Sequence, residues 1–257
     1  MVDVRGIKPV AMGTIAIQQG SPSTNKLPNL PQAPLGDFRR QAVINMARRC
    51  CYPEKHSQKV ASLARQIFCQ TRHLHGLDDE DGQLLEYAGL LHDIGHHIGH
   101  RKHHKHGYKL IVNGVLPGFA REERTILANV VRYHRKTTPQ QSHAGFAALP
   151  ARVQFKVRHL TAILRISDGL DRSRLCLFNG IWCRNMSRNR IQLQLGTSNS
   201  DSDFRLDLDS AKRRACYFEE LFGVETCFTV KTVSSPAARR LNERGNRAES
   251  NLNIRLV

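Results

Sequence analysis

The chain has 257 residues, of which 39 are lysine or arginine and 22 are aspartate or glutamate, giving a net charge of +17. It contains no run of eighteen apolar residues, so we expect no membrane-spanning helix and no membrane partner, and we find no secretory signal. Seven cysteines without a C-x-x-C pair argue against a disulfide framework or a zinc ribbon and favour a cytoplasmic protein.

The positive charge is concentrated in the middle of the chain. Residues 37–175 hold 23 basic and 12 acidic side chains, a net charge of +11. A field of this kind attracts polyanions such as nucleotides, polyphosphate or RNA. A basic surface without a specific partner would have the same composition, so charge alone does not decide between the two interpretations.

The first 36 residues are rich in Pro, Gly, Ser, Gln and Asn and have no sustained helix or strand period. We therefore predict a mostly disordered extension over residues 1–36, in which a short strand at Val10–Ile17 is the one regular element that the pattern allows. Helices are expected to start at Asp37, a residue type that suits the N-cap position.

Apolar residues at helical spacing predict six main helices between residues 37 and 175. Gly76 is expected to end the second helix, and the acidic run Asp78–Asp81 suits the N-terminus of the third. Residues Pro139–Pro150 are expected to form a loop or a short helix. The six helices are predicted at about Asp37–Cys51, Pro53–Gly76, Asp78–Asp93, His103–Asn113, Arg121–His134 and Ala151–Ser173.

The pattern changes after Leu175. Alternating or β-rich segments predict strands at Cys176–Asn185, Arg190–Leu195 and Val224–Val233, and an amphipathic helix is predicted at Ser210–Phe222. The predicted fold class is therefore mainly α. It consists of a helical bundle at 37–175, a small C-terminal α+β unit at 176–233 and a flexible basic tail at 234–257.

Seven of the thirteen histidines lie between residues 92 and 106. Imidazole is the commonest metal ligand and titrates near neutral pH, so such a cluster is costly in an ordinary core. His92 and Asp93 end the third predicted helix, while His56 and Asp168 lie on the apolar faces of two others. A metal ion bound by all four would offset the cost of burying the carboxylates. For His56 alone, a hydrogen-bonded core histidine is the simpler interpretation.

The mixture of imidazole and carboxylate ligands restricts the metal. Borderline divalent metals such as Mn, Fe, Co or Zn suit this mixture better than Ca, which prefers oxygen ligands. The expected cofactor is therefore a divalent metal, with Mn, Fe, Co, Mg and Zn as the candidates.

The order of these four ligands resembles that of the HD-domain metal phosphohydrolases. The segments LLHDIGHHIGHRKHHKHGYKLI, LPGF, VVRYHRK and LTAILRISDGLDRSR are similar to the C-terminal HD-like region of the exopolyphosphatase / guanosine pentaphosphate phosphohydrolase (Ppx/GppA) family. The segment AKRRACYFEELFG also resembles the last helix of that family. The resemblance covers about Phe38–Thr232 and implies an HD-type helical bundle with His56, His92, Asp93 and Asp168 as metal ligands.

The resemblance also leaves a second metal open. HD enzymes with two metals take further ligands from the start of the next helix and the end of the one after it. His103 (or His104, or His106) and His134 occupy such positions here. The Ppx/GppA family normally begins with two actin-like lobes that carry out the exophosphatase chemistry, and residues 1–36 contain nothing that could supply them. What carries over is therefore the HD region and its small companion, without the exopolyphosphatase activity.

Other polar residues lie near the predicted ligands. His96 and His97 follow the His-Asp pair within a helical turn and are candidate catalytic proton donors, with a solvated polar loop as the alternative. Arg135, Lys136 and Arg172 are candidates to bind phosphate oxygens of the substrate, although each alone would also suit an ordinary surface position.

These features favour a metal-dependent phosphohydrolase that acts on a nucleotide, a (p)ppGpp-like compound or polyphosphate. The alternative is a non-catalytic accessory module that binds polyphosphate or nucleotide, or that docks on an exopolyphosphatase-type partner carrying the actin-like lobes. A pure binding role has no need of all four ligands, which distinguishes the two. RNA binding is the least favoured, because Trp182 is the only tryptophan and stacking platforms are scarce. A homodimer is left open.

Overall fold

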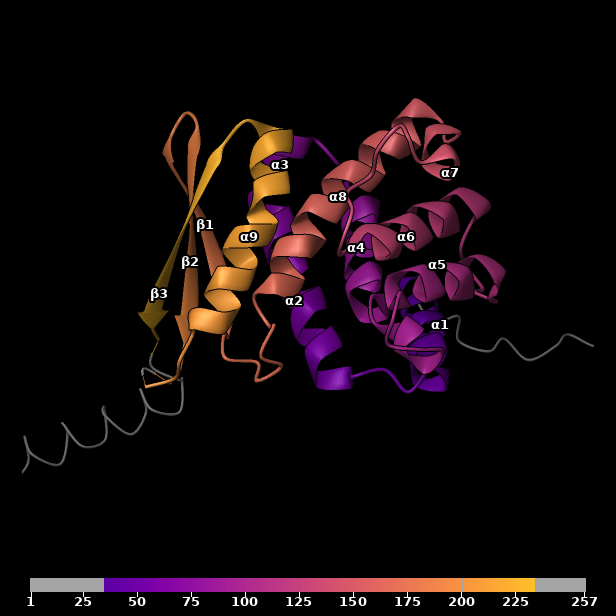
Figure 1. Cartoon of the computed structure of the whole chain (residues 1–257), viewed down its shortest axis with the longest axis horizontal. Helices are drawn as coiled ribbons and strands as arrows, with labels where there is room; N and C mark the ends of the chain where they lie inside the picture. The colour runs from indigo at the N-terminus through magenta and orange to yellow at the C-terminus, as the bar shows by residue number, and fades with distance from the viewer. Residues whose placement is uncertain (1–34, 200, 234–257) are drawn as a thin grey trace, which may run out of the picture. The chain divides into compact units, whose positions relative to one another are not determined.

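A computed structural model describes residues 35–199 and 201–233 of the chain (Figure 1). The strand predicted at Val10–Ile17 and the tail predicted at 234–257 lie outside these residues, as does almost all of the predicted disordered extension. Within the described part, no helix is long and apolar enough to span a bilayer.

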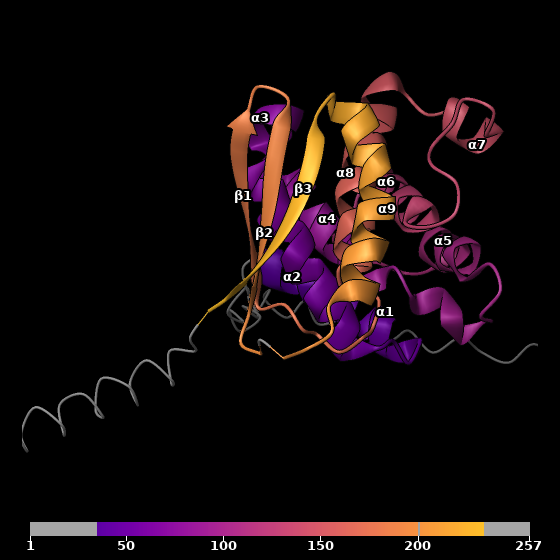
Figure 2. The same ribbon diagram turned by 60° about the vertical axis from the view of Figure 1, so that its left-hand side comes forward.

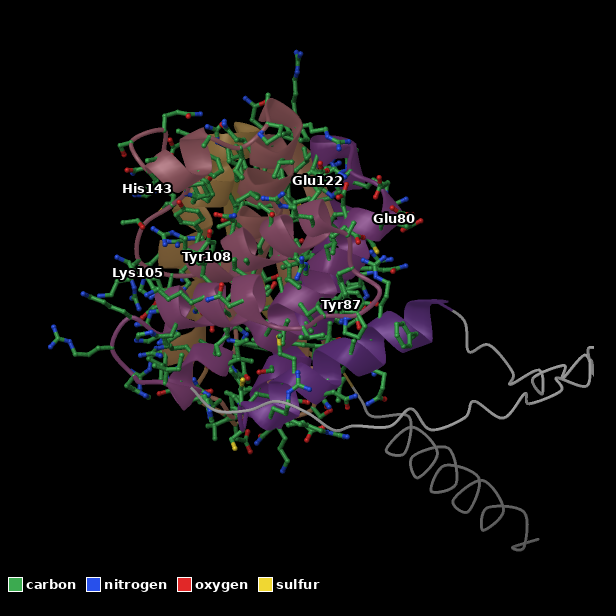
Figure 3. All side chains as sticks on the ribbon, turned by 90° about the vertical axis from the view of Figure 1, so that its right-hand side faces the viewer. Glu80, Tyr87, Lys105, Tyr108, Glu122 and His143 are labelled. Atoms are coloured by element: carbon green, nitrogen blue, oxygen red, sulfur yellow. The ribbon has the colours of Figure 1, made fainter. Side chains whose placement is uncertain are left out.

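The described residues are mainly helical, with one small sheet after the helical bundle, so the predicted fold class is confirmed. Charged side chains such as Glu80 and Lys105 lie on the exposed surface (Figure 3). The bundle contains α1 (Leu35–Arg49), α2 (Glu54–Gln70), α3 (Arg72–His75), α4 (Asp79–Leu91), the 3-10 helix η1 (Ile94–His97), α5 (His103–Asn113), α6 (Arg121–Tyr133), α7 (Ala144–Ala147) and α8 (Ala151–Gly169). The remaining elements are β1 (Gly180–Ser187), β2 (Arg190–Thr197), α9 (Arg205–Phe222) and β3 (Glu225–Thr232).

The single helix predicted up to Gly76 is in fact two helices. α2 ends at Gln70, and the short α3 ends at His75, where the C-cap residue Gly76 has a left-handed backbone with a φ of 62°. Thr71 separates them, because its hydroxyl and its amide both donate to the carbonyl oxygen of Ile67, at 2.8 and 2.9 Å. A side chain that competes for a helix carbonyl favours such a break.

The helix predicted at Ala151–Ser173 is also shorter than expected, since α8 ends at Gly169. Asp207 of α9 accepts hydrogen bonds from the amide (2.6 Å) and the hydroxyl (2.9 Å) of Ser173, which draws the chain away from the axis of α8. α9 itself begins at Arg205, five residues before the predicted start, with Asp207 in its first turn.

The sheet has the order β1-β2-β3, with an antiparallel β1–β2 hairpin and a parallel β2–β3 pair. β1 begins at Gly180 and not at the predicted Cys176, because Cys176 has a left-handed backbone (φ 53°) that a strand does not accommodate. α9 connects the two parallel strands, as a parallel pair requires, and packs along α8. The sheet and α9 therefore lie beside the helical bundle (Figure 2).

Close packing of α2, α4 and α8 positions the functional residues. The three helices contact one another in the core. At Gly89 of α4, an added Cβ would lie 2.6 Å from the Cα atom of Ala61 on α2, so only glycine allows this approach. The close approach brings together the ends of the three helices that carry His56, His92 and Asp168.

Candidate metal centre

The structure brings together all six residues that the sequence singled out as metal ligands. Each is at most 8% exposed, so these titratable groups are held in the core and not at the surface. They come from different elements: His56 from the first turn of α2, His92 and Asp93 from the turn after α4, His103 from the start of α5, His134 from the residue after α6, and Asp168 from the last turn of α8.

The first group of possible ligands contains His56, His92 and Asp93. The Nε2 atoms of His56 and His92 lie 3.2 Å apart. Asp93 Oδ2 lies 3.7 Å from Nε2 of His56 and 3.6 Å from Nε2 of His92. Asp168 closes the group from the other side, with its Oδ1 at 3.6 and 3.7 Å from the same two nitrogens.

The second group contains Asp93, His103 and His134. Asp93 Oδ1 lies 3.4 Å from Nε2 of His103, and the Nε2 atoms of His103 and His134 lie 3.3 Å apart. Asp93 therefore belongs to both groups and turns a different carboxylate oxygen toward each. A carboxylate in this position is suited to bridge two ions.

The four histidines of the two groups present the same nitrogen, Nε2, to the centre. Their other nitrogen, Nδ1, lies next to an oxygen that can only accept a hydrogen bond, so Nδ1 carries the proton. Second partners of this kind fix the tautomer and orientation of metal-binding histidines. The acceptors are the carbonyl oxygens of Gly89 for His92 (2.7 Å), Val131 for His134 (2.7 Å) and His100 for His103 (3.2 Å), and Asp171 Oδ2 for His56 (2.8 Å).

This donor set fits a divalent metal. With the protons on Nδ1, the facing Nε2 atoms of His103 and His134 (3.3 Å) have no proton between them, and those of His56 and His92 (3.2 Å) require a proton or a metal ion between them. Two carboxylates add negative charge to the same space, which a cation would balance. Imidazole nitrogens with carboxylate oxygens are the donors that Mn, Fe, Co and Zn accept.

Two arginines approach the carboxylates from outside the ligand groups. Arg174 Nη2 donates to Asp93 Oδ2 at 2.6 Å, and Arg214 of α9 donates to Asp168 Oδ2. Burial would raise the pKa of both carboxyl groups, but the neighbouring histidines and these arginines hold each pKa well below its usual range. Both aspartates are therefore ionised at neutral pH, as ligands must be.

The charged surroundings act differently on the histidines of the two groups. Burial lowers the pKa of His56, but Asp168 and Asp171 more than offset it and raise the pKa to about 9. Burial lowers the pKa of His103 to about 4, although Asp93 opposes the change. Nε2 of His56 thus lies where a positive charge is favoured, whether a proton or a metal ion, and His103 is neutral near pH 7.

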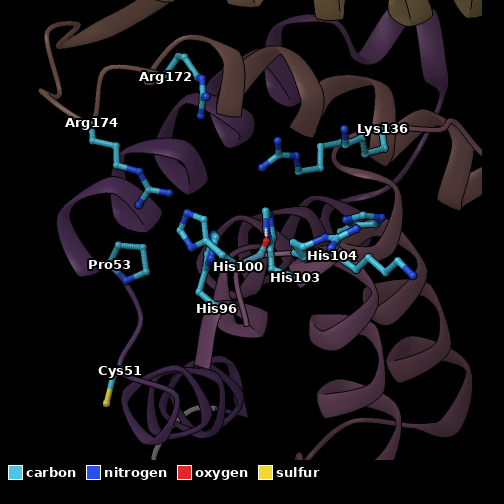
Figure 4. A pocket seen from close by; sticks show the side chains of 12 residues that line it. Cys51, Pro53, His96, His100, His103, His104, Lys136, Arg172 and Arg174 are labelled. Atoms are coloured by element: carbon cyan, nitrogen blue, oxygen red, sulfur yellow. Dashed lines mark hydrogen bonds between the residues drawn. The ribbon is translucent and has the colours of Figure 1, made fainter. Parts of the chain in front are cut away.

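A pocket of about 750 Å³ opens over the second group, and His96, His103 and His104 form part of its wall (Figure 4). The pocket has a strongly cationic lining with no acidic side chain among the residues that line it. Such a lining suits a ligand with several negative charges. The three predicted substrate-binding residues are among its six cations, which are Arg101, Lys102, Arg135, Lys136, Arg172 and Arg174.

The backbone around this pocket is strained. Among the described residues, five that are not glycine have a left-handed backbone, and four of these line the pocket: Cys51, Lys102, Lys136 and Arg174. Such conformations cost about 1–3 kcal/mol each and persist where the surrounding structure enforces them, often at binding sites. Here they direct three cationic side chains to the rim of one pocket.

His96 and His97, the candidate proton donors, have different surroundings. His96 Nε2 lies 3.3 Å from Asp93 Oδ1, and its ring stacks on that of His103 with centroids 3.9 Å apart. Nδ1 of His96 is buried without a hydrogen-bond partner among the described residues. His97 is exposed and does not line the pocket. The structure therefore brings His96, and not His97, to the centre.

Three residues of the centre were missed by reasoning from the sequence: Asp171, Arg174 and Arg214. Asp171 is fully buried and orients His56, and Arg174 contacts Asp93. Both lie close to Asp168 in the segment SDGLDRSR, so their proximity to a predicted ligand was an available signal. Arg214 lies 46 residues from Asp168 in the chain, and no sequence pattern indicates their contact.

Comparison with known proteins places the chain in a family. Residues 38–212 match the family model described as Ppx/GppA phosphatase, domain III. A guanosine-5'-triphosphate,3'-diphosphate pyrophosphatase from Pseudoalteromonas translucida (strain TAC 125) is 25% identical over 130 residues, which are 50% of this chain and 26% of that protein. The chain thus spans about a quarter of the length of the curated relative that it matches.

Proposed function

Because the chain belongs to the Ppx/GppA phosphatase family through that family's domain III, we propose that it is a metal-dependent phosphohydrolase of HD type. Its substrate would be a phosphorylated anion. The observation that carries this proposal is the pair of histidine and aspartate groups that share Asp93 next to a cationic pocket. Metal-ligand geometry and an anion-binding lining are the two requirements of such an enzyme.

His56, His92, Asp93 and Asp168 would hold one divalent ion, and Asp93, His103 and His134 would hold a second. The ions would supply an activated water near neutral pH and would neutralise charge on the phosphoryl group. The donor types agree with Mn, Fe, Co or Zn, and Mg is a further candidate because phosphate substrates often bring it.

The chain's own residues would bind the substrate and move one proton. Arg135, Lys136 and Arg172 line the pocket and would hold phosphoryl oxygens by charge-assisted hydrogen bonds. His96 lies beside the shared carboxylate and would give a proton to the leaving oxygen. The buried residues of α4 would keep bulk water away from the proposed metal centre.

A nucleotide, a (p)ppGpp-like compound and polyphosphate are the proposed substrates. The relative from Pseudoalteromonas translucida is named a guanosine-5'-triphosphate,3'-diphosphate pyrophosphatase, which supports a nucleotide with several phosphates. The six cations that line the pocket also support a substrate with several negative charges.

A non-catalytic binding module is the second candidate. It is supported by the same cationic pocket and by a family match that is confined to domain III. In that case the chain would hold polyphosphate or nucleotide for a partner of the exopolyphosphatase type, and metal would be dispensable for binding.

The deciding experiment is a screen of phosphoesters and phosphoanhydrides with Mn, Co, Mg and Zn, using the full chain. His92→Ala and Asp93→Ala should abolish hydrolysis and reduce the metal content. His73→Ala is the matched control, because His73 is exposed on α3, hydrogen-bonds to Asn185 and belongs to neither group of possible ligands. Activity that survives both ligand substitutions would contradict the proposal. Polyphosphate binding that is steeply salt-dependent but insensitive to EDTA and to His92→Ala would favour the binding module.

A further inference from the structure

Arg174 lies between two openings that lead to the metal centre. One is the cationic pocket of about 750 Å³ beside His103, and the other is a pocket of about 510 Å³ that reaches His56. Pro53 and Arg174 line both pockets. A single flexible side chain therefore faces both approaches to the two ligand groups, and Figure 4 shows it across the pocket from Lys136.

The contact of Arg174 with the centre is made through a metal-ligand oxygen. Its Nη2 donates to Asp93 Oδ2 at 2.6 Å, and the same oxygen faces Nε2 of His56 and His92 at 3.7 and 3.6 Å. The guanidinium and a cation in the first group would thus depend on one carboxylate oxygen. Two positive charges bound to the same oxygen repel each other. The cation therefore weakens the contact of Asp93 with Arg174, and Arg174 weakens the binding of the cation by Asp93.

The Arg174 side chain is free to serve another anion. It is 43% exposed, and Nη2 is the one guanidinium nitrogen with a side-chain partner among the described residues. Guanidinium groups bind phosphoryl oxygens in a planar, bidentate manner. The left-handed backbone of Arg174 (φ 62°) also shows that the turn after α8 holds this residue at the pocket against local strain.

We propose that Arg174 is a phosphate-binding residue whose guanidinium is shared between Asp93 and the substrate. Occupation of the first ligand group by a divalent cation loosens the Asp93–Arg174 contact and turns the guanidinium to a phosphoryl oxygen in the pocket. This inference rests on the proposed function and adds to it a coupling between metal binding and phosphate binding. The coupling can be measured, because Arg174 should lower the affinity for the cation and raise the affinity for the anion.

The test is the substitution Arg174→Met in the full chain, with Mn²⁺ and inorganic phosphate as probes. Calorimetric titration of EDTA-treated protein with Mn²⁺ should show tighter binding to the first group by about tenfold, equivalent to about 1.4 kcal/mol. Titration of the Mn²⁺-saturated protein with inorganic phosphate should show weaker binding, also by about tenfold. Arg172→Met is the matched control: Arg172 lies on the same turn and lines the same pocket. Among the described residues its side chain makes no hydrogen bond or ion pair to a proposed metal ligand, so Mn²⁺ affinity should change by less than about twofold.

Opposite changes in the two affinities support the proposal. Weaker or unchanged Mn²⁺ binding by Arg174→Met, in a protein whose wild type binds Mn²⁺, would show that Arg174 only positions Asp93; it would overturn the inference and leave the proposed function intact. A wild type that binds no Mn²⁺ would overturn both. If circular dichroism shows that Arg174→Met does not fold, Arg174→Lys replaces it in the phosphate titration. Lysine keeps the positive charge and loses the planar guanidinium, so phosphate binding should be weaker; unchanged phosphate binding would overturn the inference.

Discussion

Asp171→Asn should weaken metal binding at the first group and leave binding at the second group unchanged. Asp171 is fully buried, and its Oδ2 accepts the Nδ1 proton of His56 at 2.8 Å. The other carboxylate oxygen accepts the amide of Cys176 at 2.7 Å. Asparagine can keep the second contact with its carbonyl oxygen, which then places the amide nitrogen against Nδ1 of His56. An amide nitrogen can only donate, so the proton of His56 must move to Nε2.

The expected loss of metal affinity follows from the position of the proton on Nε2 of His56. Nε2 of His56 faces the other ligands of the first group, and a protonated nitrogen cannot bind a metal ion. Loss of such an orienting partner typically costs 10–100-fold in metal affinity, which is about 1.4–2.7 kcal/mol. The second group contains no atom that contacts Asp171, so its affinity should change by less than about twofold.

Calorimetric titration with Mn²⁺ checks the affinities, and long-range ¹H–¹⁵N spectra of the histidine rings check the tautomer directly. Asp81→Asn is the matched control, because Asp81 is an equally buried aspartate paired with Lys156 at the far end of α4 from His92. The reasoning would be refuted by an unchanged first site together with a His56 proton that had moved to Nε2. Equal loss at both sites would also refute it.

Three further predictions concern the support of His134, a buried histidine and a helix contact. Arg165→Met removes hydrogen bonds to the carbonyl oxygens of Tyr133 (3.0 Å) and Lys136 (3.5 Å), on either side of His134, and should weaken the second metal site by about tenfold in the same titration. Burial lowers the pKa of His75, so the unfolded chain takes up a proton at a higher pH than the folded chain does, and stability is lost as pH falls below about 6.5. The free energy of unfolding in urea, measured at pH 7.5 and 5.5, should therefore change less in His75→Gln than in the wild type. Gly89→Ala should destabilise the protein by about 1–3 kcal/mol because the new methyl group meets the backbone of Ala61, and thermal unfolding measures the change.

The burial of two proposed metal ligands was predictable because each of them conflicts with its place in a local pattern. His56 and Asp168 lie on apolar helical faces, and both are buried in the structure. A polar residue on such a face requires a partner, and that requirement can be recognised from the chain alone. The helices themselves were predictable because apolar residues recur at helical spacing.

The turn after α8 was not predictable, and the contacts of Asp171 and Arg174 depend on it. The helix stops at Gly169 because Asp207 binds Ser173, a contact between residues 34 positions apart. Neither residue conflicts with a local pattern, so the sequence offers no reason to end the helix there. Residues whose role depends on a distant hydrogen bond need the folded chain.

His96 and His97 illustrate the same limit over a shorter distance. They are adjacent and chemically identical, and only the path of the backbone through η1 turns one toward Asp93 and the other to solvent. An added Cβ at Gly95 would lie 1.9 Å from the carbonyl oxygen of His103, so this path depends on close packing of η1 against α5. Sequence spacing placed both histidines near the site, and tertiary packing separates them.

The most direct test of the proposed two-ion centre is the Mn²⁺ content and the electron paramagnetic resonance spectrum of the Mn²⁺-loaded wild type and of Asp93→Asn. Because one carboxylate faces both groups, the wild type should bind two ions per chain and give the spectrum of an exchange-coupled pair. Asp93→Asn should lose the coupling and weaken both sites. A single uncoupled ion in the wild type, or two ions retained with full affinity in Asp93→Asn, would contradict the account.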